Sequence, residues 1–421
     1  MKNMKNILVA ALAAAAIGSA HAETVYVTGS TAFRGAANLA LQAMSGMTLL
    51  ASDNTAIKSA GNLLFTNSGG FLVNVHWSGS EAGIQSILNT NAVLPYLPED
   101  GTAGTAGTNS VTPATASVNH YAQITFSDTY QATSIFNGKK AGDGFNYPNA
   151  SADNQVGVVA FTYVASKGFP SNGVSMTAST AQNLFANGFC NAALLTGSSA
   201  NQQDVCYLLG RNVDSGTRLS TLIVTGTGVA TTVHQFAVAT NYSMNANGTA
   251  ALAGTTTTNT LISYPVETIN GISSKVAGNS GYSSGGTLCG FFAKQFAPQP
   301  SFVVDGATNS TPLGGVYTGN TYLIGYAGQS DANGQTANGL VILPYEGVLP
   351  STNAIAQGQY PFWSYEHCLK GPNSTAHSGS FYTSLVNQVN GTPTSTLTPN
   401  VALGDMVVAR LVDGGVITQN Y

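Results

Sequence analysis

Charged residues are scarce in this chain, because Asp, Glu, Lys and Arg make up only 7% of its 421 residues. In soluble domains these four residue types commonly make up about a quarter of the chain. The 13 Lys and Arg residues form no basic cluster, so we expect no nucleic-acid partner. The net charge of −4 gives no long-range attraction for anions. Gly, Ser, Thr, Asn and Ala are abundant in place of the charged residues, and this composition is common in secreted and cell-surface proteins.

Cysteine is also rare, and its spacing excludes the usual zinc motifs. Four cysteines are present: Cys190, Cys206, Cys289 and Cys368. An even number in an exported chain is typical of two disulfides, for which three connectivities exist. We favour Cys190–Cys206 and Cys289–Cys368, because the first two lie close in sequence. We expect no metal and no other cofactor.

The chain lacks an apolar run long enough for a stable membrane span. Residues 1–22 instead have the pattern of a secretory signal, with Lys2 and Lys5 before an apolar core and Ala20-His21-Ala22 at the cleavage site. The mature chain would begin at Glu23 with 11 basic and 17 acidic residues, a net charge of −6. No cysteine follows the cleavage site, so we expect no lipid anchor and no membrane insertion. The predicted location is the periplasm or the exterior.

What the chain does have is a hydroxyl-rich turn over residues 210–218. It follows an apolar run at 205–209 and precedes a segment with helical character, which predicts a strand, a turn and a helix. Arg211, Ser215, Gly216 and Thr217 lie in this turn. The beginning of a helix presents unpaired N–H groups and a partial positive charge, and an arginine adds a fork of donors. This combination is typical of a site for a tetrahedral oxyanion.

The same arrangement occurs twice more upstream. Residues 24–27 predict a strand, followed by Thr28-Gly29-Ser30-Thr31 and a helical pattern. Residues 71–77 are a second apolar run, followed by a turn at 78–83 and another helical face. In open α/β sheets ligands bind beyond the carboxyl ends of strands. An alternative for each single turn is that it only caps its helix.

A fourth strand pattern, at residues 124–127, ends at Asp128. A carboxylate suits an anion site if the anion still carries a proton. Hydrogenphosphate can donate a hydrogen bond to Asp128, whereas sulfate has no proton to donate. The alternative is that Asp128 caps the turn after its strand.

Catalytic patterns are weak. Ser215 has no His and Asp partners in a recognisable order, and no P-loop or dinucleotide fingerprint follows a predicted strand. We therefore expect a binding protein and not an enzyme.

These turns resemble the phosphate-binding proteins of bacterial ABC importers, in the type 2 periplasmic-binding-protein-like superfamily. The resemblance lies in five short pieces and one pair of pieces, in the same order along the chain: Gly29-Ser30-Thr31-Ala32, residues 80–87, Phe126-Ser127-Asp128, residues 211–217, Leu323-Ile324-Gly325-Tyr326, and residues 347–351 with 358–363. It implies a two-lobe α/β fold with a hinge between the lobes and a ligand cleft.

The resemblance also implies roles for individual residues. The implied ligand set is Thr31, Ala32 through its N–H, Ser80, Asp128, Arg211, Ser215, Gly216 through its N–H, and Thr217. The sequence departs from the family pattern at two positions. Glu81 stands where the family usually has a small residue. Val213 stands where the family often has the acid that orients the arginine, and here the acid is Asp214, one position later. Arg34 and Arg218 are further cations near two of the turns. They either adjust the choice of anion or are surface residues of first helical turns, and we favour the second interpretation.

The predicted organisation is a signal at 1–22, a first part of lobe 1 at 23–167 with an inserted low-complexity loop at 99–119, lobe 2 at 168–328, and a return segment of lobe 1 at 329–421. The predicted function is that of an exported, monomeric hydrogenphosphate-binding protein that serves an ABC permease. The alternatives are a secreted cell-surface or matrix protein that reuses the fold, and a binder of another oxyanion such as sulfate.

Overall fold

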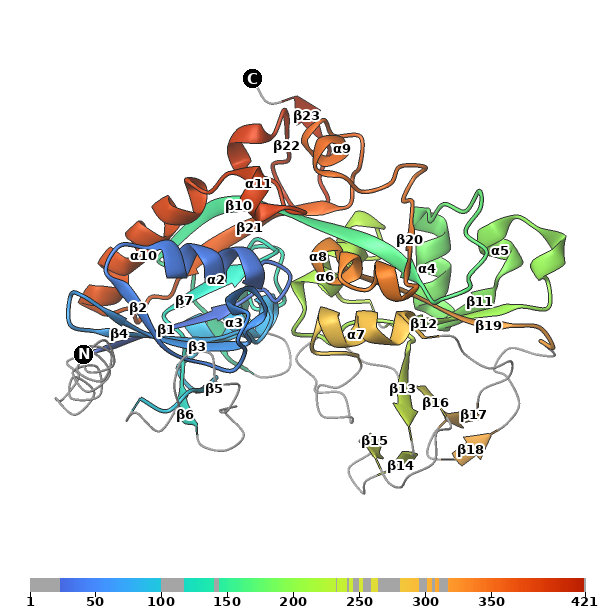
Figure 1. Ribbon diagram of the computed structural model, residues 1–421, viewed down its shortest axis with the longest axis horizontal. Coiled ribbons are helices and arrows are strands. Elements are labelled where there is room, and N and C mark those ends of the chain that lie inside the picture. Colours follow the sequence, from blue (N-terminus) through green and yellow to red (C-terminus); the bar gives the residue numbers. More distant parts are fainter. Residues whose placement is uncertain are drawn as a thin grey trace, which may run out of the picture. The chain divides into compact units, whose positions relative to one another are not determined.

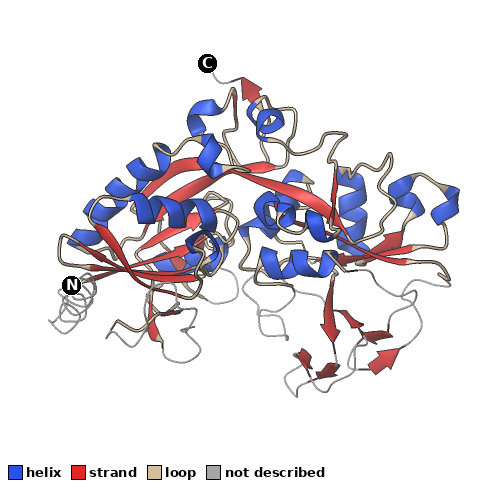
Figure 2. Cartoon of the chain, viewed as in Figure 1, coloured by secondary structure: helices blue, strands red, loops and turns tan. Residues whose placement is uncertain are grey.

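A computed structural model describes most of the chain. The described residues are 23–99, 117–139, 144–231, 233–240, 242–244, 250–252, 259–263, 281–294, 301–304, 307–309 and 317–419. The predicted signal at 1–22 and most of the predicted loop at 99–119 lie outside them. The chain is α/β, as the sequence predicts, and it divides into two compact units (Figure 2).

Unit 1 contains residues 1–127, 148–156 and 367–393. Its elements, labelled in Figure 1, are β1 (Thr24–Gly29), α2 (Arg34–Ala43), β2 (Met47–Ser52), a 3-10 turn (Ile57–Ser59), β3 (Asn62–Asn67), β4 (Leu72–His76), α3 (Ser80–Leu88), β5 (Leu94–Tyr96), β6 (Val118–His120), β7 (Ile124–Ser127) and α10 (Ala376–Asn390). The strand order is β2-β3-β4-β1-β7. The three strands β4, β1 and β7 are parallel, and their carboxyl ends therefore lie side by side.

The predicted strand-turn-helix pattern is confirmed at both upstream turns. The apolar strand β1 is buried from Val25 onward. The helical pattern after it forms α2, which buries one stripe of small and apolar residues, among them Ala37 and Leu41. The second apolar run forms β4, and α3 follows it directly after Gly79.

Unit 2 contains residues 128–147, 157–366 and 394–421. Its helices are α4 (Ala178–Asn187), α5 (Ala193–Thr196), α6 (Gly216–Val224), α7 (Gly285–Phe292), α8 (Gln329–Asn333), α9 (Thr352–Ala356) and α11 (Thr394–Leu397), with 3-10 turns at Ser199–Asn201, Thr336–Asn338 and Leu403–Asp405. Its strands are β8 (Gly138–Lys139), β9 (Asn146–Tyr147), β11 (Phe189–Asn191), β12 (Val205–Leu209), β13 (Phe236–Thr240), β14 (Tyr242–Met244), β15 (Ala250–Leu252), β16 (Asn259–Ser263), β17 (Ser301–Val304), β18 (Ala307–Asn309), β19 (Thr321–Gly328), β20 (Val341–Leu343), β22 (Val408–Ala409) and β23 (Thr418–Gln419).

The centre of unit 2 is β12, which pairs in parallel with both β13 and β19. Its apolar residues pack in one core with side chains of β19 and α7, including Leu209, Leu323, Leu288 and Phe292. Since β12 is fully buried, the turn that follows it has a fixed starting point.

The helix α4 begins with a capping box. The N-cap is Thr177, whose hydroxyl accepts from the Thr180 N–H at 3.2 Å, while the Thr180 hydroxyl accepts from the Thr177 N–H at 2.9 Å. Thr180 is thus the second half of a capping box, because the helix begins at Ala178.

Two strands have residues in both units: β10 (Ala152–Ala165) and β21 (Trp363–Lys370). The predicted boundaries, at 167 and 328, do not coincide with those of the units. The strand β19 belongs to unit 2, because it pairs with β12 and with the second half of β10. The chain enters unit 1 again within β21, after Glu366.

Candidate functional site

The two upstream turns of unit 1 follow adjacent parallel strands. Thr28 of β1 pairs with His76 of β4, and Gly29 pairs with Phe126 of β7. Gly29 has a φ of +125°, and a Cβ there would lie 2.0 Å from the Phe126 carbonyl oxygen. Only glycine lets the chain turn this close to β7. The turns therefore leave the sheet at neighbouring positions, as the sequence predicts.

Three predicted ligand residues lie in these turns. Thr31 is half-buried just before α2, and Ala32 follows it with 7% exposure. Ser80 is the first residue of α3 and is 1% exposed. Glu81, the departure from the resemblance, is equally buried. Their part in binding stays a prediction.

The turn after β12 belongs to unit 2 and begins α6. Ser215 is the N-cap, and its hydroxyl accepts from the Arg218 N–H at 3.4 Å. Gly216 and Thr217 form the first helical turn, and both are buried. The predicted cap role and the predicted position beside an anion thus fall on the same residue, Ser215.

Arg211 is 1% exposed and is held by backbone carbonyls. Its Nε donates to the Tyr282 oxygen at 2.9 Å, and its Nη2 donates to the Ser283 oxygen at 2.9 Å. The two chain segments also pair directly, since the Tyr282 N–H donates to the Gly210 oxygen at 2.9 Å. The orientation of this arginine therefore does not depend on an acid two positions later.

An acid does lie near Arg211, but it comes from α8. A Cβ on Gly285 would lie 2.1 Å from Asp331 Oδ2 and 3.3 Å from Arg211 Nη1, so the missing side chain leaves room for both groups. Burial lowers the pKa of Arg211, and the negative charges of Asp331 and then Asp128 oppose this shift. Asp331 was not predicted from the sequence, because 120 positions separate it from Arg211 and no motif contains it.

Asp128 is 1% exposed and lies next to the beginning of α6. Thr217 Oγ1 donates to Asp128 Oδ2 across a long 3.5 Å hydrogen bond. Unit 2 therefore brings together the predicted acceptor, a predicted hydroxyl and the predicted arginine. A carboxylate, a guanidinium and a capped helix end in a buried region are the groups that a protonated oxyanion needs.

Glu366 is a second buried acid, and the sequence analysis missed it. It is fully buried on β21, and the negative charge of Asp128 acts on it. The sequence gives little signal for it, because residues 363–369 mix apolar side chains with Ser364 and His367 and do not form an apolar run.

Arg218 corrects a prediction. We expected a surface residue, but its side chain is 2% exposed and its Nη1 donates to the Arg211 carbonyl oxygen at 3.3 Å. The inward direction follows from its position in the first turn of α6, where every residue from Gly216 to Leu222 is buried. Arg34 is half-buried in the first turn of α2.

The structure does not support the predicted disulfides, because none of the four cysteines, which are all described and buried, forms one. Cys190 and Cys206 are paired residues of β11 and β12. Cys289 packs in the core of unit 2, whereas Cys368 lies on β21 in unit 1, opposite Phe126. The second predicted bridge therefore joins residues that belong to different cores.

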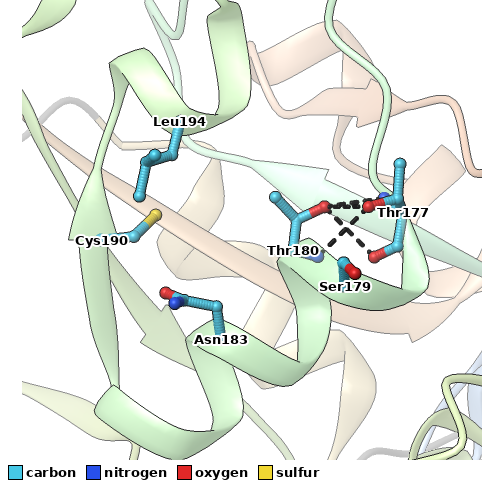
Figure 3. A pocket seen from close by; sticks show the side chains of 6 residues that line it. All are labelled: Thr177, Ser179, Thr180, Asn183, Cys190 and Leu194. Atoms are coloured by element: carbon cyan, nitrogen blue, oxygen red, sulfur yellow. Dashed lines mark hydrogen bonds between the residues drawn. The ribbon is translucent and has the colours of Figure 1, made fainter.

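One pocket, of about 230 Å³, lies beside α4 in unit 2 (Figure 3). Its lining residues are Thr177, Ser179, Thr180, Asn183, Cys190 and Leu194. The hydroxyls of Thr177 and Thr180 are engaged in the capping box. None of the predicted ligand residues lines this pocket.

Within the part of the chain that the structure describes, no group of three or more His, Cys, Asp or Glu residues could hold a metal ion. His367 is buried, and its Nδ1 lies 2.7 Å from Asp153 Oδ1, so we interpret it as a structural residue of unit 1. None of the described helices combines the length and apolar character needed to cross a bilayer.

No protein-family model and no curated protein matches this chain. Solved structures do match. An ABC-type phosphate transport receptor from Vibrio cholerae is 10% identical, with a TM-score of 0.40, 86% of this chain covered and 93% of that one. PstS from Borrelia burgdorferi is 10% identical, with a TM-score of 0.36 and coverages of 90% and 98%. The short motifs described in the sequence analysis resemble phosphate-binding proteins as well. The ligand of this chain is inferred from the residues of this chain alone.

Proposed function

We propose that this protein binds hydrogenphosphate and supplies it to an ABC-type importer from the periplasm or the exterior. The observation that carries the proposal is the arrangement around α6. Arg211 is buried and held in place by two backbone carbonyls, Ser215 caps the helix, and Thr217 contacts Asp128. Thr31, Ala32 and Ser80 of unit 1 are the further ligands that the resemblance implies.

The chemistry of this arrangement favours a protonated oxyanion. The N–H groups of Gly216 and Thr217 lie in the first turn of α6, and Arg211 supplies positive charge that burial keeps from being screened. Asp128 adds an acceptor, which a ligand with an O–H group can satisfy and sulfate cannot. Selection of this kind arises because sulfate gives Asp128 no proton and places a like charge beside a buried carboxylate.

Titration calorimetry of the purified chain with phosphate and with sulfate tests the proposal. We expect phosphate to bind at least tenfold more tightly than sulfate. Equal affinities would contradict the role of Asp128 and favour a general oxyanion binder. No binding of either anion would contradict the proposed function and leave the cell-surface alternative.

A matched variant distinguishes a local site from general charge attraction. Lys167 is exposed in the same unit, so Lys167→Ala removes one positive charge without touching the proposed site. We expect this variant to bind phosphate like the natural chain.

Fractionation of cells tests the proposed delivery to an importer, because it shows in which compartment the protein lies. A protein fixed on the outer surface would not serve an importer.

A further inference from the structure

The pairing of β21 with β7 brings Glu366 close to Asp128. The two strands are antiparallel, with His367 opposite Ser127 and Cys368 opposite Phe126. Continued by one residue beyond β7, this register would place Glu366 opposite Asp128, and the two carboxyl groups do interact. Directly opposed residues of an antiparallel pair project to the same face, with Cβ atoms about 5 Å apart. The backbone therefore brings two carboxyl groups together.

Both groups are removed from water, since Glu366 is fully buried and Asp128 is 1% exposed. Two carboxylates that share such a place do not both ionise, because each disfavours the charge of the other. Asp128 acts on Glu366 both through its charge and through a hydrogen bond between the two carboxyl groups, which favours a proton on Glu366. Burial raises the pKa of Glu366 well above its usual range, and the Asp128 charge adds to this shift.

The surrounding charges decide which carboxyl holds the proton. Arg211 attracts the Asp128 charge, and Thr217 donates to Asp128. The charge of Asp331 also acts on Arg211, and Asp413 accepts from the Tyr130 N–H at 2.9 Å. The next residue of β21, His367, faces the opposite side of the strand and pairs with Asp153. Every stabilising contact in this set favours ionised Asp128, which leaves the proton on Glu366.

We propose that Glu366 is a positioning residue that keeps this carboxyl pair at a single negative charge, so that Asp128 remains an acceptor and the site still admits an anion. The inference rests on the proposed phosphate function for its anion. A second negative charge beside Asp128 would repel phosphate and sulfate alike. Loss of the Glu366 proton at high pH should therefore weaken the binding of both anions.

The first test needs no anion. Infrared difference spectra between the natural chain and Glu366→Gln should show one carboxylic-acid C=O band at neutral pH that is absent from the variant. The control is Glu346→Gln, since Glu346 is exposed in the same unit, and this control should keep the band. A spectrum without a protonated carboxyl at neutral pH would overturn the inference, whatever the protein binds.

A second variant covers the case in which Glu366→Gln does not fold. Asp128→Asn removes the neighbouring charge, so the acid band assigned to Glu366 should disappear at a lower pH than in the natural chain. A band that disappears at the same pH in both proteins would show that the two carboxyls do not interact, and the inference would fail.

The third test uses calorimetry with phosphate and with sulfate from about pH 6 to about pH 10. In the natural chain we expect the affinity for both anions to fall at least tenfold on the alkaline side. Glu366→Gln stays neutral and should lose this fall while binding normally at low pH. Identical pH profiles would contradict the inference, whereas a natural chain that binds neither anion would contradict the proposed function and leave the infrared result to decide the inference.

Discussion

At the scale of single residues, the candidate site is a small set of buried charges with unlike surroundings. Arg211 is fixed by two carbonyls and attracted by Asp331, whereas Asp128 has a hydroxyl, a cation and a second carboxyl beside it. Glu366 is fully buried and lies beside the negative charge of Asp128, and both raise its pKa. These differences give each residue its own expected response to substitution.

Replacing Arg211 by alanine should abolish most of the phosphate affinity. The change removes a buried cation and leaves the anion beside an acid, a loss of about 2–5 kcal/mol in binding free energy. Calorimetry measures this loss, with Lys167→Ala as the variant of equal charge change. A folded Arg211→Ala protein with unchanged affinity would show that phosphate does not bind here.

Replacing Asp128 by asparagine should change selectivity more than affinity. The amide both donates and accepts, so phosphate binding should fall modestly while sulfate gains a donor. The informative quantity is the ratio of the two dissociation constants, because general damage to the fold cancels in it. A constant ratio would mean that Asp128 only completes its turn.

Glu366 should make the folded chain less stable as the pH rises. Its pKa is raised in the folded state relative to about 4.3 in the unfolded chain, so the folded state binds more protons between the two values. The free energy of unfolding therefore falls from the unfolded pKa up to the folded one. Glu366→Gln should remove this slope, which urea unfolding at several pH values measures against Glu346→Gln.

At the scale of elements, the sequence predicts well what is local. The strands β1, β4, β7 and β12 are apolar runs followed by turns, and the helices after three of them show their period in the sequence. Contacts between distant segments are a different matter. Tyr282 holds Arg211 across 71 positions, and Glu366 meets Asp128 through the pairing of β21 with β7. No local pattern encodes strand pairing at that range, so these residues could not be found.

Two helix caps offer a matched comparison at this scale. Ser215 caps α6 at the proposed site, and Thr177 caps α4 elsewhere in the same unit. Ser215→Ala and Thr177→Ala should each lower the free energy of unfolding by about 1 kcal/mol. Only Ser215→Ala should also weaken phosphate binding. Equal phosphate affinities in the two variants would assign Ser215 to capping alone.

At the scale of the whole molecule, the chain is sparsely and negatively charged. Such a protein has no long-range field that draws an anion to it. Any affinity must come from a few fixed groups at short range, and Arg211 beside α6 is the buried cation to which we assign this role.

Phosphate affinity should accordingly depend little on ionic strength. Salt screens exposed charges beyond a Debye length of about 10 Å at 0.1 M, but it acts weakly on buried ones. Raising sodium chloride tenfold should change the dissociation constant by less than about threefold, as calorimetry can measure. A steep dependence would point to binding by exposed cations, and Lys167→Ala would then be the variant that loses affinity.

The two carbonyls that hold Arg211 have a consequence for how this protein can diverge. Every amino acid carries a backbone carbonyl, and Ser283 is exposed, so its side chain can change freely without disturbing the arginine. Related proteins can therefore keep the same guanidinium geometry while sharing no residue at that position. Sequence identity will therefore underestimate how much of this site two related chains share. Superposition of the backbone around the arginine is the better test of homology.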